Sequence, residues 1–151
     1  DEDDFQIFTQ DDLLSSLGNI TGLLTVFLAV IAGISLLVGG IGIMNIMLVT
    51  VTERTREIGL RKAVGAQKGD ILLQFLVEAT VLALIGGGIG ILTATTGTII
   101  ITTALPELQA SVQFSSVLLA TMISLAIGVF FGIYPANRAA SLNPIDALRY
   151  E

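Results

Sequence analysis

The side chains that could do chemistry in this chain are charged, and most of the cations lie in residues 50–70 (TVTERTREIGLRKAVGAQKGD). This segment holds five of the seven lysines and arginines, and its acids and bases alternate. On a helix, side chains three or four positions apart face each other, so opposite charges at that spacing can form ion pairs. The predicted pairs are Glu53 with Arg56, Arg54 with Glu57, and Glu57 with Arg61. The pattern indicates an ordered helix whose charged side chains form ion pairs.

The sequence does not indicate catalytic or metal chemistry. It contains no cysteine and no histidine, which excludes disulfides, thiolate nucleophiles and histidine-based acid–base or zinc chemistry. GAQKGD (65–70) lacks the spacing of a phosphate-binding loop, and GGIGIMN (39–45) and GGGIGIL (86–92) do not complete a dinucleotide-binding motif after a strand. A net charge of −6 argues against nucleic acid as a partner. We therefore predict a chain that is not an enzyme and has no catalytic, cofactor-binding or metal-binding residues.

The charged segment lies between long apolar runs. Apolar residues make up 53% of the chain and charged residues only 13%, with a mean hydropathy of +0.86, whereas soluble domains carry about a quarter charged residues. Three runs are long enough to cross a bilayer: 23–51, 71–103 and 117–135, the last ending at Pro135. Three such runs in 151 residues leave too little polar chain to cover them in water. We predict an all-α membrane protein with three transmembrane helices.

The distribution of charge orients these spans. Segment 1–22 holds six acids and no cation, the turn 104–116 holds one acid, and all seven cations lie in 52–70 and 136–151. Short loops rich in Lys and Arg stay in the cytoplasm. We predict that 1–22 and 104–116 face outward, and that the loop 52–70 and the tail 136–151 face the cytoplasm. Because the chain opens with neither a methionine nor a signal peptide, we expect a fragment of a longer protein.

The charged loop carries the signals of a defined helix over 53–64. Apolar contact area comes from Ile58, Leu60, Ala63 and Val64, and Gly65 is a typical residue just past a helix end. Two interpretations stay open for this helix. It is either a solvated amphipathic turn on anionic headgroups or a docking helix for a cytoplasmic partner.

The C-terminal tail carries a second helix signal. Asn143 suits an N-cap, Pro144 suits the first helical position, and Asp146 falls at the third. A short helix over 144–149 is predicted, with an ordinary interfacial tail as the alternative.

Glu78 is the one ionisable side chain inside a predicted span. Carboxylates at membrane depth are candidates for proton relays, but a relay needs further titratable groups that the spans do not contain. We therefore favour a structural role, in which Glu78 pairs with Arg54 or Arg56.

Glycines spaced three or four residues apart indicate close helix–helix contacts in the spans. The alternative is that glycine is simply more frequent in spanning helices. The small residues of the first span also allow a contact between two copies of the chain. The candidate packing positions are Gly39 and Gly42 in the first span, Gly86 and Gly90 in the second, and Gly128 and Gly132 in the third.

Two longer segments resemble a known family. GGIGIMNIMLVTVTERTREIGLRKAVGA (39–66) and YPANRAASLNPIDALRYE (134–151) are similar to the hallmark segments of MacB-type ABC transporter permeases, a family that includes FtsX-like and lipoprotein-releasing permeases. The likeness covers essentially the whole chain, including DILLQFLVEA (70–79) and QDDLL (10–14). The family permease has four spans with a large outer domain between the first two. The resemblance implies that this chain holds the last three spans.

The resemblance also places the start of the chain where the outer domain returns to the membrane. Segment 1–22 is then the end of that domain and an entry helix. Residues 5–9 would be its last strand, and Thr9 with Asp12 resembles a capping box that opens the helix entering the bilayer.

Partners and a mechanism follow from the same resemblance. In the family an ATPase, fused or separate, binds ATP and Mg, two permeases pair as a homodimer or heterodimer, and motion passes through the spans to the outer domains. Membrane lipid and a periplasmic adaptor are further expected partners. The coupling position of the family falls on the charged helix, on Glu53, Arg54, Arg56, Glu57, Ile58, Leu60, Arg61 and Lys62.

Two functions remain for the chain. The favoured one is the permease part of an ABC transporter in the bacterial cytoplasmic membrane, which transmits ATP-driven motion to an extracytoplasmic domain for export or extraction of a substrate. The alternative is a self-contained three-span membrane protein with a structural or assembly role. The sequence does not identify the substrate, because that choice belongs to the outer domain.

Overall fold

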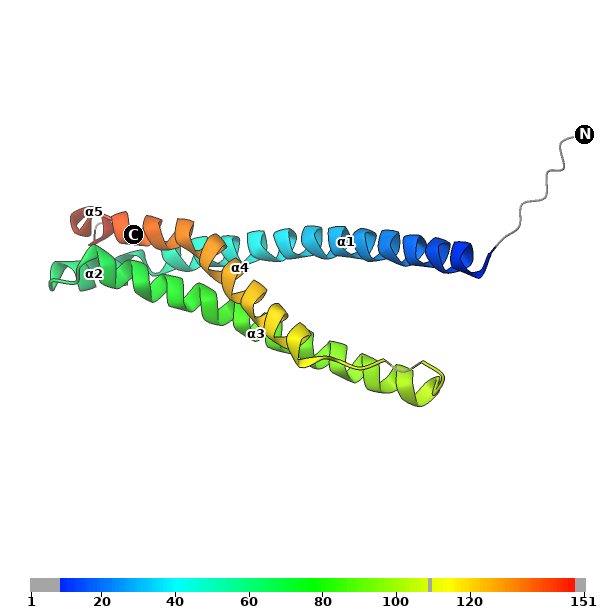
Figure 1. Cartoon of the computed structure of the whole chain (residues 1–151). Coiled ribbons are helices and arrows are strands. Elements are labelled where there is room, and N and C mark those ends of the chain that lie inside the picture. Colours follow the sequence, from blue (N-terminus) through cyan, green and yellow to red (C-terminus); the bar gives the residue numbers. More distant parts are fainter. Residues whose placement is uncertain (1–8, 109, 149–151) are drawn as a thin grey trace, which may run out of the picture. The chain divides into compact units, whose positions relative to one another are not determined.

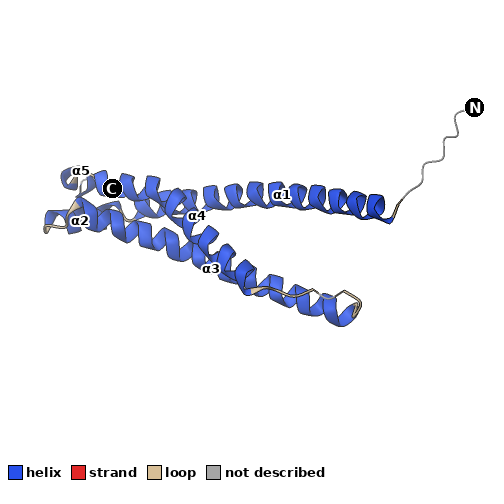
Figure 2. Ribbon diagram, in the orientation of Figure 1, coloured by secondary structure: helices blue, strands red, loops and turns tan. Residues whose placement is uncertain are grey.

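The computed structural model describes residues 9–108 and 110–148. These residues form five helices joined by short loops (Figures 1 and 2). The helices are α1 (Gln10–Glu53), α2 (Thr55–Ala63), α3 (Lys68–Ala104), α4 (Phe114–Ser141) and α5 (Pro144–Leu148). Of these, α1, α3 and α4 are long and apolar enough to cross a membrane. The prediction of an all-α membrane protein with three transmembrane helices and short additional helices is confirmed.

The chain divides into two compact units, Asp1–Val38 and Gly39–Glu151. In the first, the N-terminal end of α1 is closed by the predicted capping box. The main-chain N–H of Thr9 donates to Asp12 Oδ2 (3.1 Å), and the N–H of Asp12 donates to Thr9 Oγ1 (3.4 Å). Thr9 is thus the cap of α1, while the other residues of the predicted strand 5–9 lie outside the described residues.

Hydroxyl groups on the apolar part of α1 form their hydrogen bonds within the helix. Thr21, Thr25 and Ser35 each donate to the carbonyl oxygen four residues earlier, at distances of 2.8–2.9 Å. A polar group in lipid has no water to bond, so this internal bond removes most of the cost of its burial. These side chains are therefore compatible with a helix that faces hydrocarbon.

In the second unit, α3 and α4 run in opposite directions and pack closely along small residues (Figure 1). A β-carbon on Gly128 would lie 2.8 Å from Ala83 Cβ, and one on Gly132 would lie 2.6 Å from Ala79 Cβ. Lipid removes most of the hydrophobic drive for helix association, so contact depends on van der Waals packing between backbones that come close together. Gly128 and Gly132 allow this approach, as the spacing predicts.

The other predicted packing glycines do not contact another helix among the described residues. A β-carbon on Gly86 or Gly90 would meet no atom within 4 Å, and the same holds at Gly39 and Gly42. The close contacts fall on the glycines next to Gly86 and Gly39. Gly87 faces Ser124 of α4, and Gly40 faces the ring of Phe131. One residue along a helix turns the side-chain direction by about 100°, so the predicted glycines lie beside the contact lines rather than on them.

A compact core lies at the end of this unit where α2 and α5 are found (Figure 1). It combines the last turns of α1, the first turns of α3, the last turns of α4 and one side chain of α2. Its buried members are Met47, Val51, Ile58, Ile71, Phe75, Ala79, Ala136, Ala139 and Ala140. The core therefore joins all three long helices at the predicted cytoplasmic end.

The sequence predicts that the third span ends at Pro135, and this prediction is wrong. The helix passes through the buried Pro135 and continues to Ser141, so 136–141 belongs to α4 rather than to a tail. A proline removes only one main-chain donor from a helix, and burial of neighbouring side chains can outweigh that loss. Here Ala136, Ala139 and Ala140 of the next turns are all buried in the core.

The α3–α4 contact can be tested with Gly132→Ala. The added methyl group would overlap Ala79 Cβ, and overpacking of this kind typically costs about 1–3 kcal/mol. We expect a lower midpoint of thermal unfolding for the full-length protein in detergent, measured as loss of the monodisperse peak in size-exclusion chromatography. Gly86→Ala is the matched control, since its β-carbon would meet nothing within 4 Å. Equal midpoints for the two variants would contradict the close packing at Gly132.

Candidate functional site

The charged segment forms the separate helix α2, between α1 and α3. α1 runs to Glu53, Arg54 interrupts the helical path (φ −95°, ψ 14°), and α2 begins at Thr55. The predicted helix over 53–64 is thus shorter than expected and lacks Glu53. It ends as predicted, because Gly65 adopts a positive φ of 114°, which glycine alone adopts freely.

The end of α2 is fixed by two main-chain hydrogen bonds. The N–H of Gly65 donates to the carbonyl of Lys62 (3.1 Å), and the N–H of Ala66 donates to that of Arg61 (3.0 Å). This is the pattern of a Schellman motif, which satisfies carbonyls that a helix end leaves unpaired. The turn from α2 into α3 is therefore a defined structure rather than a free loop.

α2 has a buried face and an exposed face. Thr55, Ile58 and Gly59 are buried, and Ile58 is only 1% exposed. Leu60 and Val64, by contrast, are 57% and 83% exposed. Ile58 therefore packs in the core of this chain and is not an apolar anchor for a partner, contrary to expectation. The large apolar side chains that stay exposed are Leu60 and Val64, both of which the sequence predicts as apolar contact area of this helix.

Only one ion pair of the predicted ladder forms in the described part of the segment. Glu57 pairs with Arg61 one turn later. The pairs of Glu53 with Arg56 and of Arg54 with Glu57 are absent from these residues, because the break at Arg54 disturbs the regular helical spacing. Arg61 in addition donates to Gln74 Oε1 of α3 (2.7 Å).

Arg54 instead reaches Glu78 of α3. Its Nη1 lies 3.4 Å from Glu78 Oε2, and both side chains are partly exposed. Arg54 is one of the two cations expected to pair with Glu78; Arg56 stays exposed. α3 is long and apolar enough to span a membrane, and a positive charge beside a carboxylate lowers the cost of placing that carboxylate in a spanning helix.

Lys62 turns toward a different helix. Its Nζ donates to the carbonyl oxygen of Leu142 (2.7 Å) and to that of Ala140 in α4. Partial burial, together with the charge of Lys68, lowers the pKa of Lys62 below its usual value. The Lys62 ammonium is therefore committed to a contact inside this chain.

α5 covers part of the buried face of α2. Asn143 Oδ1 accepts from the N–H of Ile145 (3.3 Å), the predicted N-cap bond, and α5 follows from Pro144 to Leu148. The predicted last residue, Arg149, lies outside the described residues. Gly59 allows the contact, because a β-carbon there would lie 2.6 Å from Ala147 Cβ.

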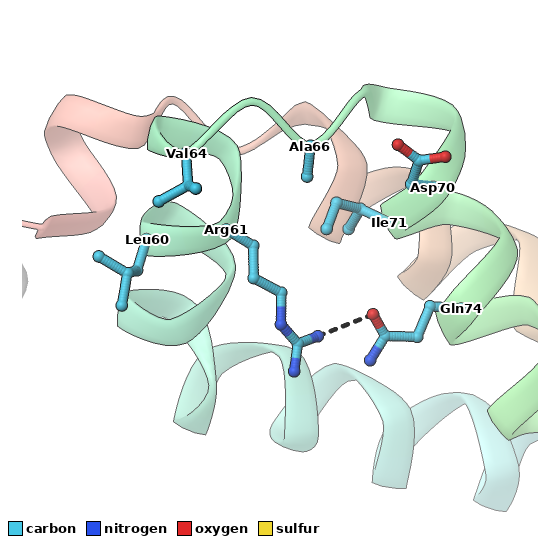
Figure 3. Close-up of a pocket in the computed structure, with 7 residues that line it drawn as sticks. All are labelled: Leu60, Arg61, Val64, Ala66, Asp70, Ile71 and Gln74. Atoms are coloured by element: carbon cyan, nitrogen blue, oxygen red, sulfur yellow. Dashed lines mark hydrogen bonds between the residues drawn. The ribbon is translucent and has the colours of Figure 1, made fainter.

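A groove lies between α2 and the first turns of α3, with a volume of 490 Å³ (Figure 3). Exposed apolar side chains from α2 form one wall, and the polar Asp70 and Gln74 of α3 stand on the other. Its lining residues are Leu60, Arg61, Val64, Ala66, Asp70, Ile71 and Gln74. Mixed apolar and charged surface of this kind suits contact with a protein. Residues 9–108 and 110–148 contain no group of three or more acids that could hold a metal ion.

Comparison with known proteins gives consistent matches to ABC transporter permeases. The family model described as "FtsX-like permease C-terminal" matches residues 17–144. The chain is 49% identical over 150 residues to "Uncharacterized ABC transporter permease YknZ" of Bacillus subtilis (strain 168), covering 99% of this chain and 38% of that protein. It is 50% identical over 148 residues to "Macrolide export ATP-binding/permease protein MacB" of Hahella chejuensis, covering 98% of this chain and 23% of that protein. The chain thus spans well under half the length of these relatives.

The contact between α2 and α5 can be tested with Gly59→Ala. The new methyl group would overlap Ala147 Cβ, so we expect α5 to be displaced at a cost of about 1–3 kcal/mol. Hydrogen exchange of the full-length protein in detergent should then be faster in the peptide that contains α5. Adding Ala147→Gly removes the opposing methyl group and should slow exchange again.

Two controls accompany this experiment. Gly69→Ala makes the same change where a β-carbon meets nothing within 4 Å. Ala147→Gly alone measures the loss of helix propensity. The predicted contact is wrong if Gly59→Ala and Gly69→Ala exchange alike.

Proposed function

Because this chain belongs to the FtsX-like permease family, we propose that it passes the motion of a cytoplasmic ATPase across the membrane to an extracytoplasmic domain. In this proposal α2 is the docking helix, and α1, α3 and α4 carry its displacement through the bilayer. The observation that carries the proposal is the division of α2 into two faces. Leu60 and Val64 point outward, while the opposite face is packed into the core that joins the long helices.

Side-chain contacts make α2 suitable for transmitting force. Arg54, directly before α2, pairs with Glu78, and Arg61 within α2 donates to Gln74, so both ends of the α2 segment are tied to α3. A docking helix on a flexible loop would absorb a displacement in its own motion. One that is bonded to a neighbouring span and packed in a shared core passes the displacement on.

ATP and Mg²⁺ belong to the ATPase in this proposal, and the permease portion supplies no catalytic group. The names of the relatives support both arrangements of that ATPase: MacB of Hahella chejuensis is an ATP-binding/permease protein, whereas YknZ is a permease. The transported substrate is selected by the extracytoplasmic domain. Export or extraction of a substrate is the proposed outcome of the transmitted motion.

A second permease copy is part of the proposed assembly. The surface around Gly39 and Gly42 supports it, since a β-carbon at either position would meet nothing within 4 Å in the described part of the chain. Small residues on an open face of a spanning helix permit close approach of another helix. Membrane lipid and a periplasmic adaptor complete the expected partners.

The proposed site of action is the bacterial cytoplasmic membrane, with α2 and α5 on the cytoplasmic side. This orientation follows the cations, because Lys and Arg in short loops remain inside. A Ser111→Cys variant of the full-length protein, with any other cysteine removed, should react with a membrane-impermeant maleimide on intact cells. A Gln67→Cys variant should react only after permeabilisation. The opposite pattern of labelling would reverse the orientation.

Docking itself can be tested with a photo-crosslinking amino acid at Leu60 of the full-length protein in its own membrane. Leu60 is an exposed apolar side chain beside cations, and such positions lie at the centre of protein contacts. We expect a crosslink to an ABC ATP-binding domain or subunit, identified by mass spectrometry.

Leu105 is the matched control, because it is equally apolar, is 55% exposed, and follows the far end of α3. A crosslinker there should not capture the ATPase. If position 60 gives no ATPase crosslink, the docking proposal fails, and a self-contained structural or assembly role becomes the better description.

A further inference from the structure

We propose that Lys62 is a positioning residue that fastens the docking helix α2 to the carboxyl end of α4. Through it, a displacement of α2 reaches α4 directly and not only by way of α3. This inference rests on the proposed function of α2 as the docking helix.

The hydrogen bonds of Lys62 show that its side chain connects α2 to the end of α4 and is not simply a charge on the surface. Its Nζ donates to the carbonyl oxygens of Ala140 and Leu142, which lie 78 and 80 residues further along the chain. An ammonium group has three donors, and these two bonds grip successive parts of the same helix end. Both carbonyl acceptors are main-chain atoms, so the contact holds the backbone of α4 itself.

The end of α4 needs an outside donor because of its own sequence. The carbonyl of Ala140 would normally accept from the N–H of residue 144, but that residue is Pro144 and has no N–H. The last four carbonyls of a helix lack partners in any case, and a cation beside them is favoured by the helix dipole. Lys62 supplies both the missing hydrogen-bond donor and the positive charge. Pro144 is also the first residue of α5, so the same side chain fixes the point where α4 gives way to α5.

The three cations that bond to other helices, Arg54 just before α2 and Arg61 and Lys62 within it, thus have different targets. Arg54 and Arg61 reach side chains of α3, whereas Lys62 reaches the backbone at the end of α4. The contact of Gly59 with Ala147 is a further attachment of α2, in this case to α5. Loss of Lys62 should therefore loosen α2 from α4 and leave its connection to α3 in place.

The test uses spin labels on the full-length protein in its own assembly, at exposed positions. One label pair, Ala63→Cys with Ser141→Cys, reports the distance between α2 and α4. A second pair, Ala63→Cys with Leu73→Cys, reports the distance between α2 and α3. Pulsed electron paramagnetic resonance then measures both distances without nucleotide and with ATP and vanadate.

We expect Lys62→Met to broaden the α2–α4 distance distribution and leave the α2–α3 distribution unchanged. Lys62→Arg keeps a donor and a charge and should restore the narrow α2–α4 distribution. Lys68→Met is the matched control for loss of one lysine in the same segment and should resemble the parent protein. An α2–α4 distribution that stays narrow in Lys62→Met overturns the proposal, and so does one that Lys62→Arg fails to restore.

A second variant separates positioning from folding. Pro144→Ala restores a main-chain N–H at position 144, which pairs with the Ala140 carbonyl once α4 extends through Leu142. Lys62→Met combined with Pro144→Ala then keeps the end of α4 capped without the link to α2. If Lys62→Met lowers the amount of protein in the membrane, the combined variant should recover abundance and still show the broad α2–α4 distribution. Recovery of abundance together with a narrow distribution means that Lys62 acts only as a cap, and the proposal is wrong.

Failure of this inference is distinguishable from failure of the proposed function. The photo-crosslinker at Leu60 reports docking and should capture the ATPase in the parent protein and in Lys62→Met alike. Loss of the crosslink in the parent protein removes the docking proposal. The α2–α4 distances without nucleotide still decide whether Lys62 ties the two helices.

Discussion

The structure of the Gly39–Glu151 unit depends on how closely α3 and α4 approach each other. Lipid gives two apolar helices little reason to associate, so their contact relies on small residues that let backbones touch. Gly128 and Gly132 of α4 meet Ala79 and Ala83 of α3 in this way. The approach brings the last turns of α4 beside the first turns of α3. The core at that end, the seat of α2 and the position of α5 all follow from it.

The second constraint is the satisfaction of polar groups where helices end. The carboxyl ends of α2 and α4 leave carbonyl groups without a partner inside the helix, and the two ends use different donors to pair them. α2 uses the main-chain N–H groups that follow its terminal glycine. α4 cannot do this fully because Pro144 lacks a donor, and it takes the ammonium of Lys62 instead. Because the N–H is missing at Pro144, the end of α4 bonds to Lys62 of α2, and this bond connects two helices that are distant in the sequence.

These contacts give the charged residues of segment 50–70 a structural role within the chain. Three of its cations, Arg54, Arg61 and Lys62, bond to α3 or α4 within the chain. Arg56 remains exposed beside Leu60 and Val64 on the outward face. The orientation of a membrane protein depends on how many cations a loop carries. The contacts with α3 and α4, by contrast, depend on the exact positions of these cations. The positions of these cations therefore attach the α2 segment to α3 and α4.

The sequence by itself determined the features that depend on neighbouring residues. Long apolar runs gave the three spanning helices, and caps at Thr9 and Asn143 and the stop at Gly65 fixed three helix ends, because these signals act within about one turn. Which side of α2 faces inward was decided only by the tertiary structure. Ile58 and Lys62 turn into the chain because α4 and α5 arrive there from some 80 residues away. The same distant packing decided that Gly87 and Gly40, rather than Gly86 and Gly39, make the close contacts, and that α4 continues past Pro135. Helical periodicity defines the faces of a helix, but the crossing of its neighbours decides which of them is buried.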